Sequence, residues 1–336
     1  MIFLQLPDKE KIELINQMHN ETNLPQVIIE KDLWVTAVLR ALFELPYADN
    51  ISFKGGTSLS KCWNLIERFS EDVDIAINRE YFGFTGDSFT IRQISKELRK
   101  KTCKFIRETL QFDLHKSMLN NGIPHNLFSV SMDITPITTV DPERVFVEYQ
   151  SVFVTDKYIK NTVILEVSGR SMKEPIEKIR IESFIDKYFS NAAFSQQPFE
   201  IIVVVPERTF WEKVCLLHEE FSKSTDNIRV ERMSRHLYDL ARMMNSSVRI
   251  NALTNQDLFN SIVSHRSMFI PISGFNYDTL TSKSINIIPP ENLIDSWEKD
   301  YNKMQTMIYG ENILSFKEII GQLVLLNEEI NKLNWE

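Results

Sequence analysis

Residues 53–77 read FKGGTSLSKCWNLIERFSEDVDIAI, and this stretch limits the structure of the chain more tightly than any other. On a β-strand, residues two apart point to the same face, so Asp72 and Asp74 would share one face and Val73 and Ile75 the opposite, apolar one. Two carboxylates held side by side repel unless a cation lies between them, and Mg²⁺ binds carboxylates together with substrate phosphates. An exposed, half-polar edge strand is the alternative for this pair on its own.

A glycine pair precedes the aspartates. The chain holds only nine glycines in 336 residues, and Gly55 and Gly56 follow a predicted strand that ends near Phe53. A helical pattern begins near Thr57, so the glycines lie in the turn between strand and helix. There they permit positive φ and the close approach of a ligand, and the free N–H groups of a helix start attract phosphate. Thr57 or Ser58 adds a hydroxyl. The alternative is a tight turn with Thr57 as the N-cap.

The order strand, Gly-Gly-Thr, helix and Asp-Val-Asp resembles the nucleotidyltransferase fold shared by DNA polymerase β and its relatives. The fuller string, KGGTSLSK followed by RFSEDVDIAI, resembles the AbiEii/AbiGii toxin family of nucleotidyltransferases, known from bacterial abortive-infection (phage defence) and toxin–antitoxin operons. The resemblance implies that residues 55–57 cradle the triphosphate of an NTP and that Asp72 and Asp74 bind Mg²⁺, with Mn²⁺ as a substitute. The other residues of this string that we assign to the nucleotide are Ser58, Lys61, Arg68 and Ser70.

The resemblance also implies a reaction, the transfer of NMP from an NTP to an acceptor hydroxyl with release of pyrophosphate, and a third carboxylate on a neighbouring strand. A carboxylate inside an apolar strand is costly unless it is paired or binds a metal, and Glu166 lies in the apolar run 163–167. Glu166 is our first candidate to complete the metal site or to take the proton from the attacking hydroxyl. Asp133, in the run SMDIT, has the same local pattern and is the rival.

Two blocks in the C-terminal half extend the resemblance. Lys213, in PERTFWEKVCLLH, lies on the apolar face of its helix, where a lysine either snorkels at the rim or reaches a bound triphosphate. That block and SRHLYDLARM resemble recurring blocks of the AbiEii family, which implies that Lys213 and Asp239 belong to the active site. A helix-surface ion pair between Arg235 and Asp239 is the alternative. By the same resemblance His265 and Arg266, in SHRSMF, correspond to a basic position near the nucleotide.

A helix expected over residues 88–114 is basic within an acidic chain. Residues 91–110 hold seven Lys or Arg and two Glu, a local balance of +5, whereas the whole chain carries a formal net charge of −8. The overall charge argues against broad coating of nucleic acid but is compatible with one basic patch. A phosphate-rich partner such as RNA would fit a basic stripe on one helix face, with a solvated face as the alternative. The stripe consists of Lys96, Lys100, Lys104 and Arg107.

The partners follow from the resemblance alone: a cognate antitoxin, and the tRNA acceptor end as the acceptor of some relatives. A protein or small-molecule acceptor is the alternative, and so is a non-catalytic NTP-binding protein of the same fold. Three cysteines without metal-ligand spacing predict a reducing compartment. We find neither a signal peptide nor an apolar run of membrane-spanning length. We therefore expect a cytoplasmic protein that does not bind membranes.

The pattern along the chain predicts an α+β fold with two lobes. Residues 1–205 would form a nucleotidyltransferase-like lobe, a mixed β-sheet with flanking helices, and residues 206–336 a helical lobe that closes the active-site cleft. Strand candidates precede this boundary, and almost only helical patterns follow it. We expect the charges of Glu30, Lys31 and Asp32 on a solvated helix face, with contact to the nucleotide as the alternative. The strands expected after the aspartates lie at 126–134, 145–154, 161–167, 176–184 and 199–205.

Overall fold

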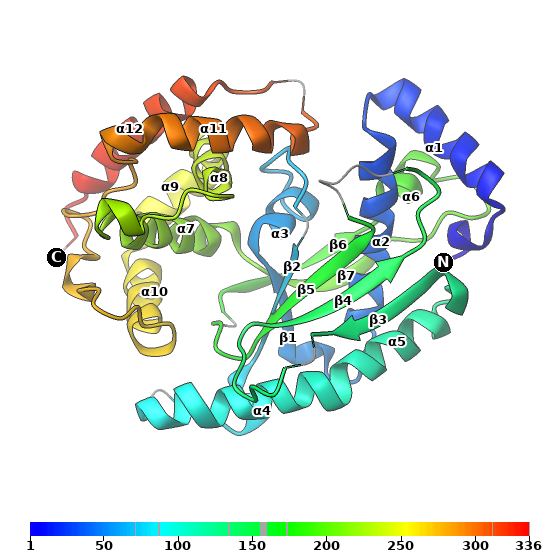
Figure 1. Cartoon of the computed structure of the whole chain (residues 1–336), viewed down its shortest axis with the longest axis horizontal. Helices are drawn as coiled ribbons and strands as arrows, with labels where there is room; N and C mark the ends of the chain where they lie inside the picture. Colours follow the sequence, from blue (N-terminus) through cyan, green and yellow to red (C-terminus); the bar gives the residue numbers. More distant parts are fainter. Residues whose placement is uncertain are drawn as a thin grey trace. The chain divides into compact units, whose positions relative to one another are not determined.

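The computed structural model divides into two compact units (Figure 1). The first consists of residues 1–62 and 70–204, and the second of residues 63–69 and 205–336. Ile134, the last residue of one expected strand, lies outside the described residues. The residues that the structure describes are 1–70, 72–86, 88–133, 135–154, 160–172, 174–310 and 312–335.

The short segment 63–69 groups with the second unit, although the pattern along the chain placed it in the N-terminal lobe. Its backbone holds it there, because Phe69 N–H donates to Met307 O at 2.7 Å. Arg68 also forms an isolated antiparallel bridge with Ile308. These partners lie at opposite ends of the chain, so no local pattern predicts the pairing.

In the described part of the chain, one seven-stranded sheet forms the core of the first unit, in the order β3-β4-β5-β2-β1-β7-β6. The pairs β2–β5 and β1–β7 are parallel and the other four are antiparallel, so the sheet is mixed, as expected. The strands are β1 (Ile51–Lys54), β2 (Asp72–Ile77), β3 (Phe128–Met132), β4 (Glu143–Tyr149), β5 (Thr162–Ser168), β6 (Ile176–Ile181) and β7 (Phe199–Val204).

Helix α2 (Gln26–Phe43) packs against β5 and β7 and against the helices α1 (Asp8–Thr22), α5 (Gln111–Asn120) and α6 (Phe184–Tyr188). This covering buries Glu30, Lys31 and Asp32, so the prediction of a solvated face was wrong. Each buried charge has a partner: Lys31 Nζ donates to Lys160 O at 2.6 Å, and Glu30 accepts the N–H of Val152 at 2.9 Å. The shorter helices of this unit are α1 (Asp8–Thr22), α2 (Gln26–Phe43), α3 (Gly55–Lys61) and α6 (Phe184–Tyr188).

One long helix of the first unit joins η4 (Gln93–Leu98), α4 (Arg99–Phe105), η5 (Ile106–Leu110) and α5 (Gln111–Asn120). A row of its buried side chains recurs at every fourth residue, with Cys103 and Ser117 buried beside it, and the row consists of Ile94, Leu98, Thr102, Ile106, Leu110, Leu114 and Met118. An α-helix has about 3.6 residues per turn, so a period of four would drift off the core by about 40° per turn.

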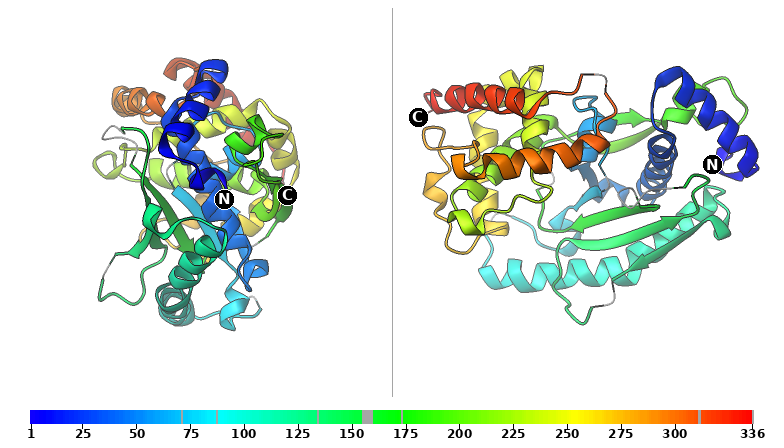
Figure 2. Two further views of the ribbon diagram at one scale, coloured as in Figure 1. Left: turned by 90° about the vertical axis from the view of Figure 1, so that its right-hand side faces the viewer. Right: turned by 45° about the horizontal axis from the view of Figure 1, so that its top comes forward.

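The two segments η4 and η5 are π-helical, and their i→i+5 hydrogen bonds take more residues per turn. They therefore cancel the drift and keep the apolar stripe on the protein side along the whole helix. Figures 1 and 2 show this helix running beside β3, against which α5 packs.

The same period of four leaves an exposed stripe on the outer side of the long helix. Arg107 is not part of it, because its Nε donates to Glu143 Oε1 at 2.8 Å and its Nη1 donates to Thr135 O at 2.9 Å. The predicted basic stripe therefore loses Arg107. The exposed residues at this spacing are Arg92, Lys96, Lys100, Lys104, Glu108, Phe112 and Lys116.

Helices dominate the second unit, as expected. Buried aromatic side chains, among them Trp211, Trp297 and Tyr301, lie between these helices. No helix within the described ranges is long and apolar enough to cross a membrane. The helices are α7 (Pro206–Phe221), α8 (Ser234–Met244), α9 (Ser247–Thr254), α10 (Gln256–Phe269), α11 (Ile294–Met304) and α12 (Phe316–Asn331).

Candidate active site

Asp72 and Asp74 lie on β2 with partly exposed side chains, whereas Val73 and Ile75 beside them are fully buried. The aspartates therefore share the open face of the strand, as their alternation predicts. Glu166 on β5 lies directly opposite Asp74 in the parallel register, and residues paired in this way point to the same face of a sheet. Three carboxylates from two neighbouring strands thus lie on one face.

A row of four charged residues crosses the sheet at the level of Asp74. Glu166 lies opposite Arg144 on β4, and Asp74 lies opposite Lys54 on β1. Arg144 Nε donates to Glu166 Oε1 at 3.0 Å. Because a cation flanks each end of the two acids, the row offsets part of their mutual repulsion. No role was predicted for Arg144, or for Lys54 as the first residue of KGGTSLSK, and only the strand register brings them to the carboxylates.

Asp133 lies away from this row. It follows the end of β3 and is exposed, and β4 and β5 separate β3 from β2. Adjacent strands are about 4.8 Å apart, so three steps put β3 about 14 Å from β2. The strand order therefore favours Glu166 over Asp133 as the third carboxylate.

Gly55 joins the glycine motif to the aspartate motif. It begins α3 with a φ of 77°, a conformation that other residues adopt only with strain. A Cβ added to Gly55 would lie 2.0 Å from Oδ2 of Asp74. The carboxylate of Asp74 therefore occupies the space that a side chain at residue 55 would need.

Gly55→Ala is expected to destabilise the first unit by about 1–3 kcal/mol through backbone strain and also to displace the carboxylate of Asp74. Nucleotide transfer should therefore fall by more than the loss of folded protein explains. Urea denaturation and a transferase assay measure the two effects. The matched control is Gly86→Ala, since Gly86 has a φ of 86° and nothing within 4 Å of its added Cβ. An equal loss of activity in both variants would refute the role of the Gly55–Asp74 contact.

The hydroxyl groups of the glycine turn point inward. Thr57 is buried, and its Oγ1 donates to the backbone carbonyl of Asp72. Ser58 is fully buried, and its Oγ donates to Gly55 O at 2.8 Å. These hydroxyls brace the turn between β1 and α3, whereas Gly55 and Gly56 stay partly exposed. The backbone of the two glycines is thus the part of this turn that is open to a phosphate.

Lys61 is held in a buried ion pair within the first unit. Its Nζ lies 2.6 Å from Oδ1 of Asp32, and the two side chains are 5% and 8% exposed. Lys61 also donates to Glu182 O at 3.2 Å, and the other oxygen of Asp32 accepts the N–H of Phe184 at 2.7 Å. In this arrangement Lys61 anchors α3 to α2 and to the start of α6.

Asp239 is the centre of a buried charge cluster in the second unit. Its Oδ1 and Oδ2 accept hydrogen bonds from Nε and Nη2 of Arg68, both at 2.7 Å. Oδ2 also lies 2.8 Å from Lys213 Nζ, which in turn is 3.3 Å from Nδ1 of His236. The side chains of Arg68, Asp239 and Lys213 are 3%, 0% and 8% exposed. Protein cations therefore contact both oxygens of Asp239.

The charges of this cluster and its burial shift the pKa values of Asp239, Lys213 and His236. Burial would raise the pKa of Asp239, but Arg68 and Lys213 outweigh this effect and hold the pKa below its usual range. Burial lowers the pKa of Lys213, and the charge of Asp239 opposes that shift only in part. Burial, aided by the charge of Lys213, lowers the pKa of His236 far enough that its imidazole is neutral. Arg68 and Lys213 facing one carboxylate leave a surplus positive charge, which favours an anion nearby.

A family model identifies the protein family of this chain. The model described as nucleotidyl transferase AbiEii toxin, type IV toxin–antitoxin system, matches residues 37–322. The chain belongs to the AbiEii family. This AbiEii protein is therefore a toxin nucleotidyltransferase, with an NTP as substrate and a cognate antitoxin as the partner that the type IV system implies.

Two solved structures are similar to this AbiEii protein over most of its length. JHP933 from Helicobacter pylori has 18% sequence identity, covers 90% of each chain and gives a TM-score of 0.43. MenT4, a nucleotidyltransferase toxin from Mycobacterium tuberculosis, has 16% identity, covers 90% of this chain and 92% of its own, and gives a TM-score of 0.40. A search of curated proteins finds no match.

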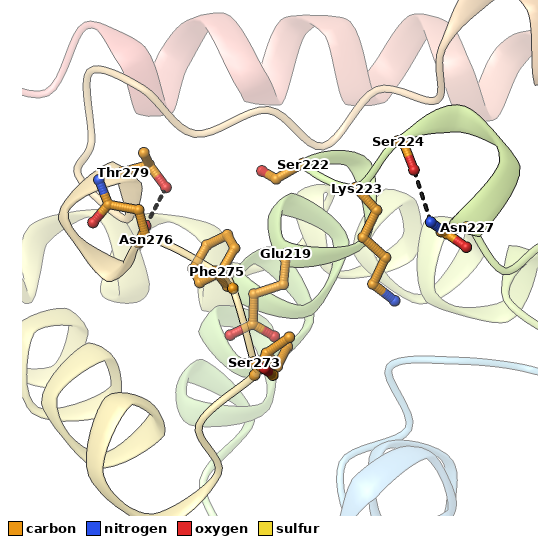
Figure 3. A pocket seen from close by; sticks show the side chains of 11 residues that line it. Glu219, Ser222, Lys223, Ser224, Asn227, Ser273, Phe275, Asn276 and Thr279 are labelled. Atoms are coloured by element: carbon orange, nitrogen blue, oxygen red, sulfur yellow. Dashed lines mark hydrogen bonds between the residues drawn. The ribbon is translucent and has the colours of Figure 1, made fainter.

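Ser70 and Arg266 complete the predicted nucleotide contacts of this AbiEii protein. Ser70 is 7% exposed. Arg266 Nε donates to Glu219 Oε1 at 2.7 Å, and its Nη2 contacts the other carboxylate oxygen. Glu219 lines a pocket of about 550 Å³ in the second unit, with Lys223 and Phe275 among the other walls (Figure 3). Arg266 is therefore tied to a carboxylate at this pocket.

Proposed function

We propose that this AbiEii toxin transfers an NMP from an NTP to a hydroxyl at the 3′ acceptor end of tRNA, in the bacterial cytoplasm. The observation that carries the proposal is the pair Asp72 and Asp74 with Glu166 in register beside Asp74. Phosphoryl transfer depends mostly on positioning and on electrostatic stabilisation of the phosphate. Carboxylates held on the strands of a sheet supply a rigid frame for both.

A divalent cation fits this set of donors, and we propose Mg²⁺, with Mn²⁺ as a substitute. Asp72 and Asp74 offer two partly exposed carboxylates on one face, and Mg²⁺ is bound by one or two carboxylates with substrate phosphates and water as further ligands. When bound, the metal would stabilise negative charge on the phosphate oxygens. Among the described residues, we find no group of three His, Cys, Asp or Glu side chains that could hold a metal ion by itself.

The remaining roles fall to residues that the chain itself positions. Glu166 would take the proton from the attacking hydroxyl, and its ion pair with Arg144, whose side chain is 56% exposed, is open to exchange. The backbone of Gly55 and Gly56 would approach the triphosphate. Lys213, oriented by its buried ion pair with Asp239, would neutralise charge on a phosphate group.

The exposed stripe of the long helix supports RNA as the acceptor. Arg92, Lys96, Lys100 and Lys104 are exposed at every fourth residue. Because the π-helical segments remove the drift of this period, the four cations stay in one row. Such a row can neutralise successive phosphates, which is the interaction that supplies affinity for nucleic acid without regard to sequence.

Replacing Lys96, Lys100 and Lys104 together with Ala is expected to leave NTP binding unchanged and to weaken RNA binding. The slope of log Kd plotted against log salt concentration should fall by about three, by one for each lost phosphate contact. Fluorescence anisotropy with labelled tRNA over a salt series measures this change. A matched control replaces Lys283, Lys299 and Lys303, which are exposed lysines of the second unit. If both triple variants bind tRNA equally, the stripe is not the docking surface.

The function is tested by incubating the purified protein with each labelled NTP, Mg²⁺ and total bacterial RNA, beside Asp72→Ala. Label on tRNA-sized RNA with the wild type only would establish the transfer, its acceptor and its preferred base. Label on protein instead of RNA would show that the acceptor is a protein. If no NTP labels any macromolecule, the RNA proposal fails, and small-molecule acceptors must be tested before a non-catalytic role is accepted.

A further inference from the structure

The solvent face of α12 carries a small apolar centre between two opposite charges. Lys317, Gly321, Val324 and Glu328 are exposed and follow one another at steps of four, three and four. This is the spacing of residues that form the seam between two packed helices. Val324 is 38% exposed, and Leu325 beside it is 59% exposed. The described residues of this chain thus leave the seam of α12 uncovered.

Gly321 is the second unusual feature of this face. It lies in the middle of α12, and nothing lies within 4 Å of a Cβ added to it. Glycine destabilises a helix interior relative to alanine, and within this chain there is room for the alanine. A neighbour that approaches α12 closely from outside would explain why a residue without a side chain stands there.

We propose that α12 pairs antiparallel with α12 of a second copy of this chain, around a two-fold axis halfway between residues 322 and 323. Lys317 and Glu328 are equally far from that axis, so each lysine would face the glutamate of the other copy. Gly321 and Val324 are also equally far from it, so each valine would cover the gap at the other glycine. One axis therefore satisfies both the charges and the shapes.

This self-complementarity is what selects a second copy as the occupant, since a two-fold interface uses the same patch on both subunits. The seam is short, because a helix of 16 residues is about 24 Å long. One such helix pair buries less area than a stable complex needs, so the dimer is weak and depends on protein concentration. The proposal concerns a surface of the second unit and does not depend on the acceptor of the reaction.

Sedimentation equilibrium of the full chain over a concentration series tests the pairing of charges. Lys317→Glu and Glu328→Lys each bring like charges together across the axis, and each is expected to raise the dimer Kd about tenfold or more. The double variant restores opposite charges and should return Kd to near the wild-type value. Glu328→Lys also removes the pair with Lys332, but that pair is 57% and 75% exposed and contributes little.

Gly321→Ala separates association from folding. If Gly321 receives Val324 of the second copy, the variant weakens the dimer and at the same time raises the Tm measured at low concentration by about 2 °C, because alanine favours the helix. A chain that is monomeric at all concentrations would overturn the proposal. So would a dimer that the charge reversals leave unchanged, or one that the double variant fails to restore, because its contacts would then lie elsewhere.

Discussion

Asp74→Asn is expected to lower the rate of nucleotide transfer by about 10²–10³-fold, the loss typical for removal of one electrostatic group from an active site. Asparagine has the same shape as aspartate, so it still fits the narrow space beside Gly55, where Asp74 leaves no room for a Cβ. What changes is the charge: with Glu166 already paired to Arg144, one carboxylate at Asp72 would remain to bind the metal. The fold should therefore persist while the chemistry is lost.

A transferase assay with saturating NTP, accompanied by circular dichroism and a thermal melt, measures this effect. Asp133→Asn is the matched control, because it makes the same chemical change at an exposed position beyond β3. It should transfer nucleotide at the wild-type rate. If both variants lost transfer activity to a comparable extent, Asp133 would also belong to the active site. The strand order would then be a poor guide to the third carboxylate.

Asp239→Ala is expected to destabilise the second unit by about 3–5 kcal/mol, the cost of removing one partner from a buried ion pair. The change leaves Arg68 and Lys213 buried without the carboxylate that both contact. The pKa of Asp239 lies below its ordinary value, so its stabilising charge is present at neutral pH and is lost only as the pH falls. The difference between wild type and variant should therefore narrow only below about pH 4.

Denaturant unfolding followed by tryptophan fluorescence suits this measurement, because four of the five tryptophans, all except Trp34, belong to the second unit. The control is Glu108→Ala, which removes an ion pair with Lys104 whose side chains are 64% and 69% exposed. Exposed pairs of this kind contribute about 0–1 kcal/mol. If Asp239→Ala lowered the free energy of unfolding no more than the control, the Arg68–Asp239–Lys213 cluster would not stabilise the second unit.

The stability measurement also bears on the role of Asp239 in the reaction. The family resemblance assigns Asp239 to the active site, and the structure shows both of its oxygens in contact with Arg68 and Lys213. A large loss of stability would identify Asp239 as the residue that positions Lys213. A loss of activity without a loss of stability would instead favour direct contact with the substrate.

Much of the fold can be predicted from local patterns, and so can the part of the candidate site formed by the glycine turn and the two aspartates. The alternation around Asp72 and Asp74 predicts their shared face, since side chains on a strand alternate with a period of two. The scarcity of glycine makes the strained turn at Gly55 visible. The five later strands and most of the C-terminal helices follow from periodicity as well, whereas the π-helical segments of the long helix required the structure.

The contacts of individual charged residues could not be predicted in this way. Lys61 and Arg68 look like nucleotide contacts in the motif string, yet their carboxylate partners lie 29 and 171 positions away. The same is true of Arg266, whose partner Glu219 is 47 positions away. Burial of a charge depends on which distant carboxylate the fold brings to it, and no local pattern contains that information.

Local patterns along the chain are enough to predict the candidate glycine and aspartate motifs, the mixed α+β character and the family, because each pattern lies within a short stretch of sequence. The three-dimensional structure was needed to show that Glu166 lies beside Asp74 and that Asp133 does not, because β5 pairs with β2 across a long stretch of intervening chain. It also decided that the charges of α2 are buried, since the packing of other elements around that helix covers them. Local periodicity determines on which face of a helix or strand a side chain lies, and long-range packing determines which residues contact that face.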